Sequence, residues 1–274
     1  EEANNAPATV KMADGKGKEA GYKYVMQVSV MDCTGCGNCV ASCPMAAKEN
    51  APIKMIAFDD EAAKQAEAWD YTIALPSKAN PEDKFTVKGS QFEQPLLEFS
   101  GACAGCGETP YAKLITQLFG DRMYVANATG CSSIWGGSAP TSPYTTNAEG
   151  KGPAWSNSLF EDNAEFGLGM ATAVRHMREG IKAKLETLKP MACEELAAAI
   201  DNWIANMALG EESKAASAEL VAKLEGFVTE NEEAKAIVDY VLENKDQLVK
   251  KSQWIFGGDG WAYDIGYGGV DHVL

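Results

Sequence analysis

The spacing of hydrophobic residues in the first 58 positions favours short strands over long helices. Apolar residues alternate with others over residues 24–30, which predicts a half-buried strand, and residues 53–57 suggest a second short strand. Residues 45–50 lie between them and suit a short helix. Residues 1–21 are polar and show a period of neither 2 nor 3.6, so we expect a surface connection there.

Helical spacing dominates after residue 58. Residues 59–70, 111–119 and 159–186 are predicted to be helical, and residues 193–249 repeat the helical pattern. In this last stretch the apolar residues form two stripes that we interpret as core: Leu196, Ile200, Trp203 and Met207 on one face, and Leu220, Leu224 and Val228 on another.

Two glycines interrupt the helical pattern of residues 159–186. Gly167 and Gly169 lack side chains, which would allow close approach by a cofactor or by another backbone. Residues 122–126 and 254–256 are short apolar runs typical of strands, and each leads into a glycine-rich turn. Such turns at strand ends hold ligands in α/β folds.

The pattern predicts an organisation in three parts. Residues 1–58 form a partial α+β module, and residues 59–80 form a linker region that ends in a proline-bounded loop. Residues 81–274 form an α/β domain, with a parallel sheet and helices, that includes a helical segment at residues 180–250.

Composition and charge constrain location and partners. With 24 Lys and Arg against 39 Asp and Glu, the net charge of −15 disfavours nucleic acid and anionic membranes as partners. No stretch approaches the roughly 18 apolar residues of a membrane span, and the polar start lacks the basic-then-apolar order of a secretory signal. We therefore expect a globular, cytoplasmic protein. The chain begins without Met and ends within a motif, so we expect a piece of something longer.

Four closely spaced cysteines carry the most specific chemical signal. Their spacing, CxxCxxCxxxCP, is that of a bacterial ferredoxin run and comprises Cys33, Cys36, Cys39 and Cys43. Gly35 and Gly37 let such a loop fold tightly enough for three sulfurs to converge on one [4Fe–4S] cube. Zinc is the alternative, although four-coordinate zinc sites usually combine two CxxC halves separated by a longer spacer.

The run does not complete a cluster by itself. In two-cluster ferredoxins the first three cysteines share one cube and the fourth binds the other. Cys33, Cys36 and Cys39 therefore need a fourth ligand, and Cys43 belongs to a second cube. No partner run exists in the sequence, so we expect the remaining thiolates upstream of Glu1 or on another chain.

A second set of cysteines lies in glycine-rich surroundings. Cys103 and Cys106 form a CxxC pair, and Cys131 follows a Thr-Gly dipeptide. A zinc ribbon would need a second CxxC pair, which the sequence lacks, whereas the glycines suggest loops that approach a cluster or a cofactor. Cys193 has no such neighbours, and we interpret it as an ordinary structural cysteine.

The remaining chemical signals are fewer. Gly257, Gly258, Asp259 and Gly260 follow a predicted strand, and Asp259 could bind a Mg²⁺ that carries a pyrophosphate. A plain glycine-rich turn is the alternative. The only histidines are His176, which we interpret as a surface or packing residue, and His272. No Walker loop or Ser/His/Asp elbow is present, so nothing supports a kinase or a hydrolase.

Five segments together resemble one enzyme family. They are the ferredoxin run, GACAGCGETPY, NATGCSSIWGGSAPTSPYTTN, GPAWSNSLFEDNAEFGLGMA and GGDGWAYDIGYGG. From about residue 25 onward the chain resembles pyruvate:ferredoxin (or flavodoxin) oxidoreductase. It is similar to an internal segment that spans the second half of the two-cluster ferredoxin-like domain and the first half of the thiamine diphosphate-binding domain.

The resemblance implies roles for individual residues. Cys103, Cys106 and Cys131 would bind a proximal [4Fe–4S] cluster, whose fourth cysteine is expected beyond Leu274. Asp259, within the turn that includes Gly258 and Gly260, would bind Mg²⁺ for the diphosphate. The thiamine pocket would be lined by Thr129, Gly130 and Ser132, with Phe160 near the pyrimidine ring. No catalytic residue can be assigned, because the family's activating Glu is normally in other domains.

The resemblance also implies the reaction and its partners. The full enzyme would oxidatively decarboxylate pyruvate, transfer the acetyl group to coenzyme A, and pass electrons through [4Fe–4S] clusters to ferredoxin or flavodoxin. It would be a homodimer. We expect the isolated 274-residue chain to be inactive without the rest of the full-length chain or its partner subunits. The alternatives are a separate iron–sulfur subunit of a multi-chain complex and an oxidoreductase for another 2-oxo acid.

Overall fold

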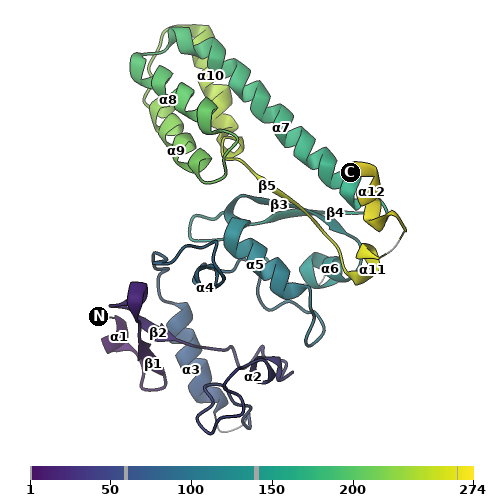
Figure 1. Ribbon diagram of the computed structural model, residues 1–274. Helices are drawn as coiled ribbons and strands as arrows, with labels where there is room; N and C mark the ends of the chain where they lie inside the picture. The colour runs from purple at the N-terminus through teal and green to yellow at the C-terminus, as the bar shows by residue number, and fades with distance from the viewer. Residues whose placement is uncertain (1, 59–60, 139–141, 264) are drawn as a thin grey trace. The chain divides into compact units, whose positions relative to one another are not determined.

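The computed structural model divides the chain into two compact units, residues Glu1–Leu118 and Phe119–Leu274 (Figure 1). The structure describes residues 2–58, 61–138, 142–263 and 265–274. The domain boundaries near residues 58 and 80 stay predictions.

The first unit holds little regular structure. An antiparallel hairpin pairs β1 (Met12–Asp14) with β2 (Lys23–Val25). The helices are α1 (Glu2–Asn5), α2 (Asn38–Ala41), α3 (Ala62–Ile73), α4 (Val87–Ser90) and α5 (Thr109–Phe119), the last of which reaches the second unit with its final residue. The predicted helices at residues 59–70 and 111–119 are confirmed as α3 and α5, although residues 59 and 60 lie outside the described residues.

Four predictions for the first unit are wrong in whole or in part. The strand expected over residues 24–30 ends at Val25, and its partner β1 lies inside the segment expected to be only a connection. Residues 53–57 form no strand, and residues 45–50 form turns in place of a helix. Met55 and Ile56 are 55% and 61% exposed. Since no apolar layer of the described chain covers them, burial does not stabilise a strand there.

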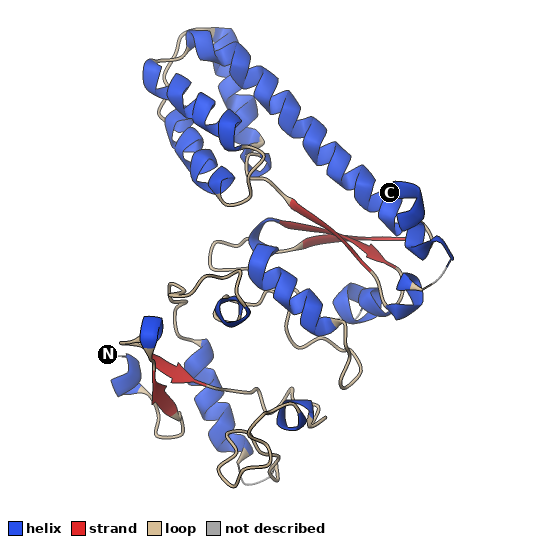
Figure 2. Cartoon of the chain, in the orientation of Figure 1, coloured by secondary structure: helices blue, strands red, loops and turns tan. Residues whose placement is uncertain are grey.

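The second unit is built on a three-stranded parallel sheet. Its order is β4 (Ala154–Ser158), β3 (Met123–Ala128) and β5 (Ser252–Phe256), with β3 in the centre (Figure 2). In the register of the sheet, Val125 lies opposite Trp155 on one side and Trp254 on the other. The predicted strands at residues 122–126 and 254–256 are confirmed, and so is a parallel α/β arrangement. Short helices α6 (Cys131–Ser133), α11 (Asp259–Ala262) and α12 (Val270–Val273) complete this part.

A long helix connects the sheet to a helical cluster. Helix α7 (Asn163–Leu188) packs against β3 and β5 at its start and against α8 (Glu194–Asn206) and α10 (Glu232–Glu243) further along. A methyl group on Gly167 would lie 2.4 Å from Cγ2 of Ile255, so this glycine permits close packing of α7 on the sheet. A methyl group on Gly169 would meet no described heavy atom within 4 Å outside its own helix, so close approach by a cofactor at this glycine stays a prediction.

The helical cluster has a continuous apolar core. Helix α9 (Glu212–Glu225) packs against α8 and contributes Leu220 and Leu224, which are fully buried. Trp203 is also fully buried, and its Nε1 donates a hydrogen bond of 3.1 Å to the carbonyl of Leu248. Val228 is 94% exposed, so its prediction as core is wrong. The helix ends at Glu225, and beyond that residue helical spacing no longer decides which side chains are buried.

Among the described helices, none combines the length and the apolar content that crossing a bilayer requires.

Candidate functional site

The ferredoxin-like run forms an open loop with two left-handed glycines. Gly35 and Gly37 have φ angles of +68° and +76°, and Cys36 lies between them. Gly37 is the N-cap of α2, which carries Cys39, and the backbone N–H of Cys33 donates to the carbonyl of Ser29 at 3.0 Å. The glycine conformations therefore support the tight loop that the sequence predicts.

The thiols of the run are accessible. Cys33, Cys36 and Cys39 are exposed, Cys43 is half-buried, and all four are free cysteines. In the described part of the chain, no three side chains of His, Cys, Asp or Glu converge on one metal-sized position. The donor chemistry nevertheless fits a cluster, because four accessible thiols on a short loop with positive φ angles can supply soft sulfur ligands.

The second cysteine pair lies beside the first run. The N–H of Cys106 donates to the carbonyl of Cys103 at 3.0 Å, and Gly105 between them has a φ angle of +75°. A methyl group on Gly105 would lie 2.8 Å from Nδ2 of Asn38. Since Asn38 precedes Cys39, two segments about 65 residues apart bring both cysteine loops into proximity within the first unit.

The third predicted ligand of that set belongs to the other unit. Cys131 is the first residue of α6 and is exposed. The structure thus assigns Cys103 and Cys106 to one compact unit and Cys131 to the other. Cys193 is exposed and is the residue from which α8 begins, with no side-chain capping bond.

The predicted cofactor residues of the second unit share one edge of its sheet. Because β4, β3 and β5 are parallel and in register, their carboxyl ends lie together. The predicted residues follow these ends directly: Thr129, Gly130 and Ser132 after β3, Phe160 after β4, and Gly258, Asp259 and Gly260 after β5. This is the edge at which open α/β sheets bind ligands.

Local contacts shape the turn after β3. Gly130 has a φ angle of +146°, and its N–H donates to Oγ of Ser133 at 2.9 Å. Ser132 is buried, and its hydroxyl donates to the carbonyl of Ala128 at 3.3 Å. The hydroxyl of Thr129 donates to the carbonyl of Ser158 at 2.7 Å, which joins this turn to the end of β4.

The turn after β5 leaves its carboxylate at the surface. Gly258 is buried, whereas Asp259 and Gly260 are exposed, and α11 begins at Asp259. A methyl group on Gly260 would lie 4.0 Å from Cζ of Phe160. The segments after β4 and β5 therefore meet, as a site that uses both of them requires.

A network of amides connects the strand ends, and sequence reasoning missed it. Asn163 is fully buried; its Nδ2 donates to the carbonyl of Phe256 at 3.0 Å and its Oδ1 accepts from the hydroxyl of Ser158 at 2.9 Å. Asn127 donates to Oδ1 of Asn157 at 2.9 Å. The polar sequence SNSLFEDN was the only sequence feature that pointed to this network. Its polar residues conceal strand β4, which the hydrophobic pattern does not predict.

Two carboxylates stand at the start of α7, next to this edge. Asp162 is the residue from which α7 begins, and its Oδ1 is buried with no hydrogen-bond partner among the described residues. Glu165 is in the first turn, where a hydrogen bond from its own backbone and another with His272 Nδ1, 2.9 Å away, lower the pKa of its carboxyl group. A buried carboxylate oxygen without a donor suits a site that receives a cation, so these residues fit a bound Mg²⁺.

Comparison with known proteins bears on the ferredoxin-like run and on the chain as a whole. Residues 26–49 match the family described as the 4Fe-4S binding domain, which confirms a [4Fe–4S]-binding segment around the predicted run. The whole chain is 52% identical to a pyruvate-flavodoxin oxidoreductase of Enterobacter agglomerans and covers 23% of its length. For the pyruvate:ferredoxin oxidoreductase of Moorella thermoacetica, 98% of the chain matches at 51% identity, again over 23% of that protein.

A more distant relative has a different name. The chain is 45% identical over its whole length to a pyruvate dehydrogenase [NADP(+)] of Cryptosporidium parvum, of which it covers 16%. The chain spans about a quarter of the length of the two oxidoreductases from Enterobacter agglomerans and Moorella thermoacetica. Along that quarter the chain matches an internal segment of the pyruvate:ferredoxin (flavodoxin) oxidoreductases at about half of its residues.

Proposed function

We propose that the chain is the part of a pyruvate:ferredoxin (flavodoxin) oxidoreductase that joins the thiamine diphosphate site to the iron–sulfur clusters. The observation that carries this proposal is the identity of about half of all residues, along the whole chain, with enzymes of that name. The whole enzyme would convert pyruvate and coenzyme A to acetyl-CoA and CO₂. Two electrons would leave, one at a time, for ferredoxin or flavodoxin.

The cysteines would hold the electron carriers. Cys33, Cys36 and Cys39 would share one [4Fe–4S] cube and Cys43 would bind a second one. The positive φ angles of the neighbouring glycines support this role because they let the thiols approach a common point. Cys103, Cys106 and Cys131 would bind the proximal cube.

The carboxyl edge of the sheet would hold thiamine diphosphate and Mg²⁺. The cofactor supplies the carbanion chemistry at the 2-oxo carbon. On this chain, Asp259 would bind the metal ion, and Gly258 and Gly260 would leave room for the diphosphate. Residues Thr129, Gly130 and Ser132 would line the other side, with Phe160 packed against the cofactor ring.

Positioning is the main task of the surrounding residues. Asn163 ties the ends of β4 and β5 together, so it would fix the turn that carries Asp259 relative to Phe160. The hydrogen bond of Thr129 to Ser158 would do the same for the turn after β3. In a preorganised site of this kind, little conformational entropy is lost when the ligand binds.

The proposal extends to assembly and location. The α/β domain would be of the thiamine diphosphate-binding type, and residues 1–58 would be part of a ferredoxin-like domain. The complete enzyme would be a cytoplasmic homodimer, and its acceptor would be ferredoxin or flavodoxin. An oxidoreductase for another 2-oxo acid is the second candidate, because the retained residues include no assigned substrate contact.

Anaerobic metal analysis of the full-length protein tests the proposal. Three [4Fe–4S] cubes would give about twelve irons and about as many acid-labile sulfides per protomer. Pyruvate should reduce flavodoxin or ferredoxin in the presence of coenzyme A, thiamine diphosphate and Mg²⁺. The same assay with 2-oxobutyrate and with 2-oxoglutarate measures the preference among 2-oxo acids. Stoichiometric zinc without sulfide would overturn the cluster assignment, and a clear preference for another 2-oxo acid would replace pyruvate as the substrate.

A further inference from the structure

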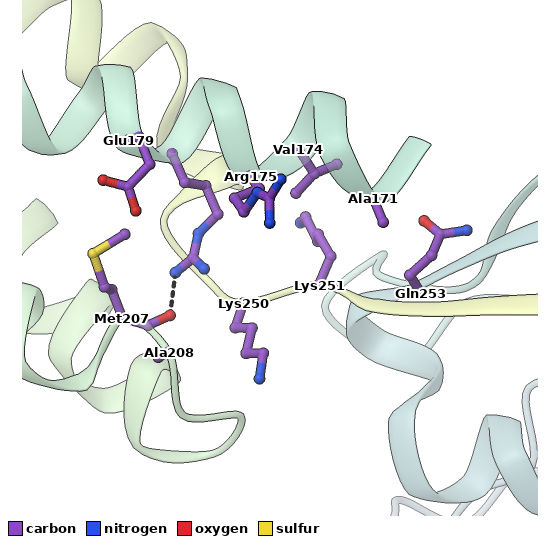
Figure 3. A pocket seen from close by; sticks show the side chains of 10 residues that line it. Ala171, Val174, Arg175, Glu179, Met207, Ala208, Lys250, Lys251 and Gln253 are labelled. Atoms are coloured by element: carbon purple, nitrogen blue, oxygen red, sulfur yellow. Dashed lines mark hydrogen bonds between the residues drawn. The ribbon is translucent and has the colours of Figure 1, made fainter. Parts of the chain in front are cut away.

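A cavity lies at the amino end of β5, away from the site at the carboxyl edge. It has a volume of about 320 Å³ and lies between the middle of α7, the loop after α8 and the residues that lead into β5 (Figure 3). Strand β5 has five residues, so roughly 16 Å of strand separates the two ends. The cavity is therefore separate from the candidate cofactor site at the carboxyl edge of the sheet.

Cations dominate the charged lining of this cavity. Arg175 and Arg178 come from α7, Lys250 and Lys251 precede β5, and Glu179 is the only carboxylate among the lining residues. The chain as a whole has a net charge of −15. A local excess of three positive charges against that background indicates a function for the cluster.

Arg178 is a fixed part of the wall. It is buried, and its guanidinium donates to the carbonyls of Gln247 at 2.9 Å, Met207 at 2.7 Å and Leu248 at 2.9 Å. Burial lowers its pKa, and the neighbouring charge of Glu179 opposes that shift. Carbonyl oxygens satisfy its donors without neutralising its charge, so Arg178 contributes a permanent positive field.

Three other cations of the lining form no ion pair. Neither Arg175, Lys250 nor Lys251 forms an ion pair with any residue that the structure describes. Lys251 is half-buried, and its Nζ lies 5.5 Å from the centre of the Tyr124 ring. In Figure 3 its side chain extends from the start of β5 toward α7.

The surroundings of Lys251 disfavour its charged form. Burial is the largest cause that lowers its pKa, and the charges of Lys151 and Arg178 lower it further, whereas Asp246 and Asp121 raise it. A partly desolvated ammonium group without an acceptor is costly. An anion in the cavity would remove that cost.

We propose that this cavity binds a small ligand that bears a phosphate group. Guanidinium and ammonium groups pair well with phosphate oxygens, and Arg175 and Lys251 offer one of each. Val174 and Met207 provide apolar surface for the rest of the ligand, and the volume is at the low end of small-molecule sites. This inference does not depend on the proposed function.

Site-directed labelling of the full-length protein tests the inference. Pyridoxal 5′-phosphate carries both a phosphate and an aldehyde; the lysine amine and the aldehyde form an imine with loss of water, and borohydride reduces it. Peptide mapping then locates each modified lysine, whatever other sites the protein has. We expect Lys251 or Lys250 to be modified faster than the exposed Lys235 on α10. Millimolar pyrophosphate should slow the modification of the cavity lysine by about tenfold and leave that of Lys235 unchanged.

Variants make the test specific. Arg175→Gln should raise the pyrophosphate concentration needed for protection about fivefold to tenfold, whereas Lys235→Gln removes the same charge elsewhere and should leave it unchanged. Equal labelling of all exposed lysines, or equal protection by sodium chloride at matched ionic strength, would overturn the proposal. Protection by polyglutamate but not by pyrophosphate would also overturn it, in favour of an acidic protein partner.

Discussion

The cysteine loops of the first unit and the helical cluster of the second unit are stabilised in different ways. In the helical cluster, Trp203, Leu220 and Val241 are fully buried and belong to one continuous core. Around the ferredoxin-like run, Met31 and Met55 are 72% and 55% exposed, and the cysteines themselves are accessible. Apolar burial thus accounts for the folding of one region, whereas the other needs ligand bonds, as metal-dependent modules do.

Removing a core side chain should give the largest change in stability. Trp203→Ala removes a fully buried indole and its hydrogen bond to Leu248, so we expect a loss of about 3–5 kcal/mol in the free energy of unfolding. Denaturant titration followed by circular dichroism measures this. Val228→Ala, at a position that is 94% exposed, is the control and should change it by less than about 0.5 kcal/mol. Similar losses in both variants would contradict the assignment of the core.

The amide network should give an intermediate change. Asn163→Ala removes the donor to the carbonyl of Phe256 and one of the acceptors of the Ser158 hydroxyl, which also donates to the carbonyl of Leu159. We expect a loss of about 1–3 kcal/mol in the free energy of unfolding. It should also weaken the binding of thiamine diphosphate, measured by calorimetry on the full-length protein. Asn202→Ala removes an exposed amide on α8 and serves as the matched control. Unchanged affinity in Asn163→Ala would show that the network does not position the cofactor site.

A cysteine of the run should matter for metal content and not for the apolar core. Cys36→Ser should change the stability of the metal-free protein by less than about 0.5 kcal/mol, because the thiol is exposed. In the anaerobically purified full-length protein it should remove about four irons per protomer. Iron and sulfide assays check this, with Cys193→Ser as the control that should keep every iron. Full iron content in Cys36→Ser would remove this residue from the ligand set.

The smallest effect concerns a surface carboxylate of the first unit. Hydrogen bonds from Lys88, from Lys18 and with Glu19 lower the pKa of Glu82 to about 2. A carboxyl group with a lowered pKa in the folded state stabilises the fold above its ordinary pKa of 4.5 and loses that contribution as the pH falls toward 2.

Glu82→Gln should therefore lower the melting temperature slightly at pH 6, and the difference from the unaltered protein should vanish by about pH 2. Thermal unfolding across this range measures it. Glu230→Gln changes the same charge at an exposed position and should show no such pH dependence. A difference between Glu82→Gln and the unaltered protein that persists at pH 2 would exclude an ionic origin.

The two regions also differ in how far their structures follow from the sequence. In the second unit, helical and strand periods correctly predicted α7 to α10, β3 and β5. The helices bury apolar faces, β3 is almost wholly buried and β5 is half-buried along its length. In the first unit the apolar residues within 45–57 wrongly predicted a helix and a strand, since Met55 and Ile56 are exposed. Periodicity predicts structure only where a core decides the conformation.

The site was predictable in its chemistry but not in its connections. Cysteine spacing predicted the segment that matches the 4Fe-4S binding domain, and the GGDG turn follows a strand as expected, whereas the roles of individual donors stay predictions. The polar strand β4 has no apolar period, so the role of Asn163, which depends on the neighbouring ends of β4 and β5, could not be read from the sequence. Likewise, the approach of Gly105 to Asn38 joins residues far apart in the chain.

Helix α7 has 26 residues, which corresponds to a rod of about 39 Å. Its first turn holds Asn163 between two strand ends, and its last turns lie in the apolar core of the helical cluster. A continuous helix is stiff along its axis, so we expect a displacement of the cluster end of α7 to reach the polar edge at its start. Repacking of the distant core by a mutation or a ligand would therefore register as altered hydrogen exchange at the amides of residues 257–260.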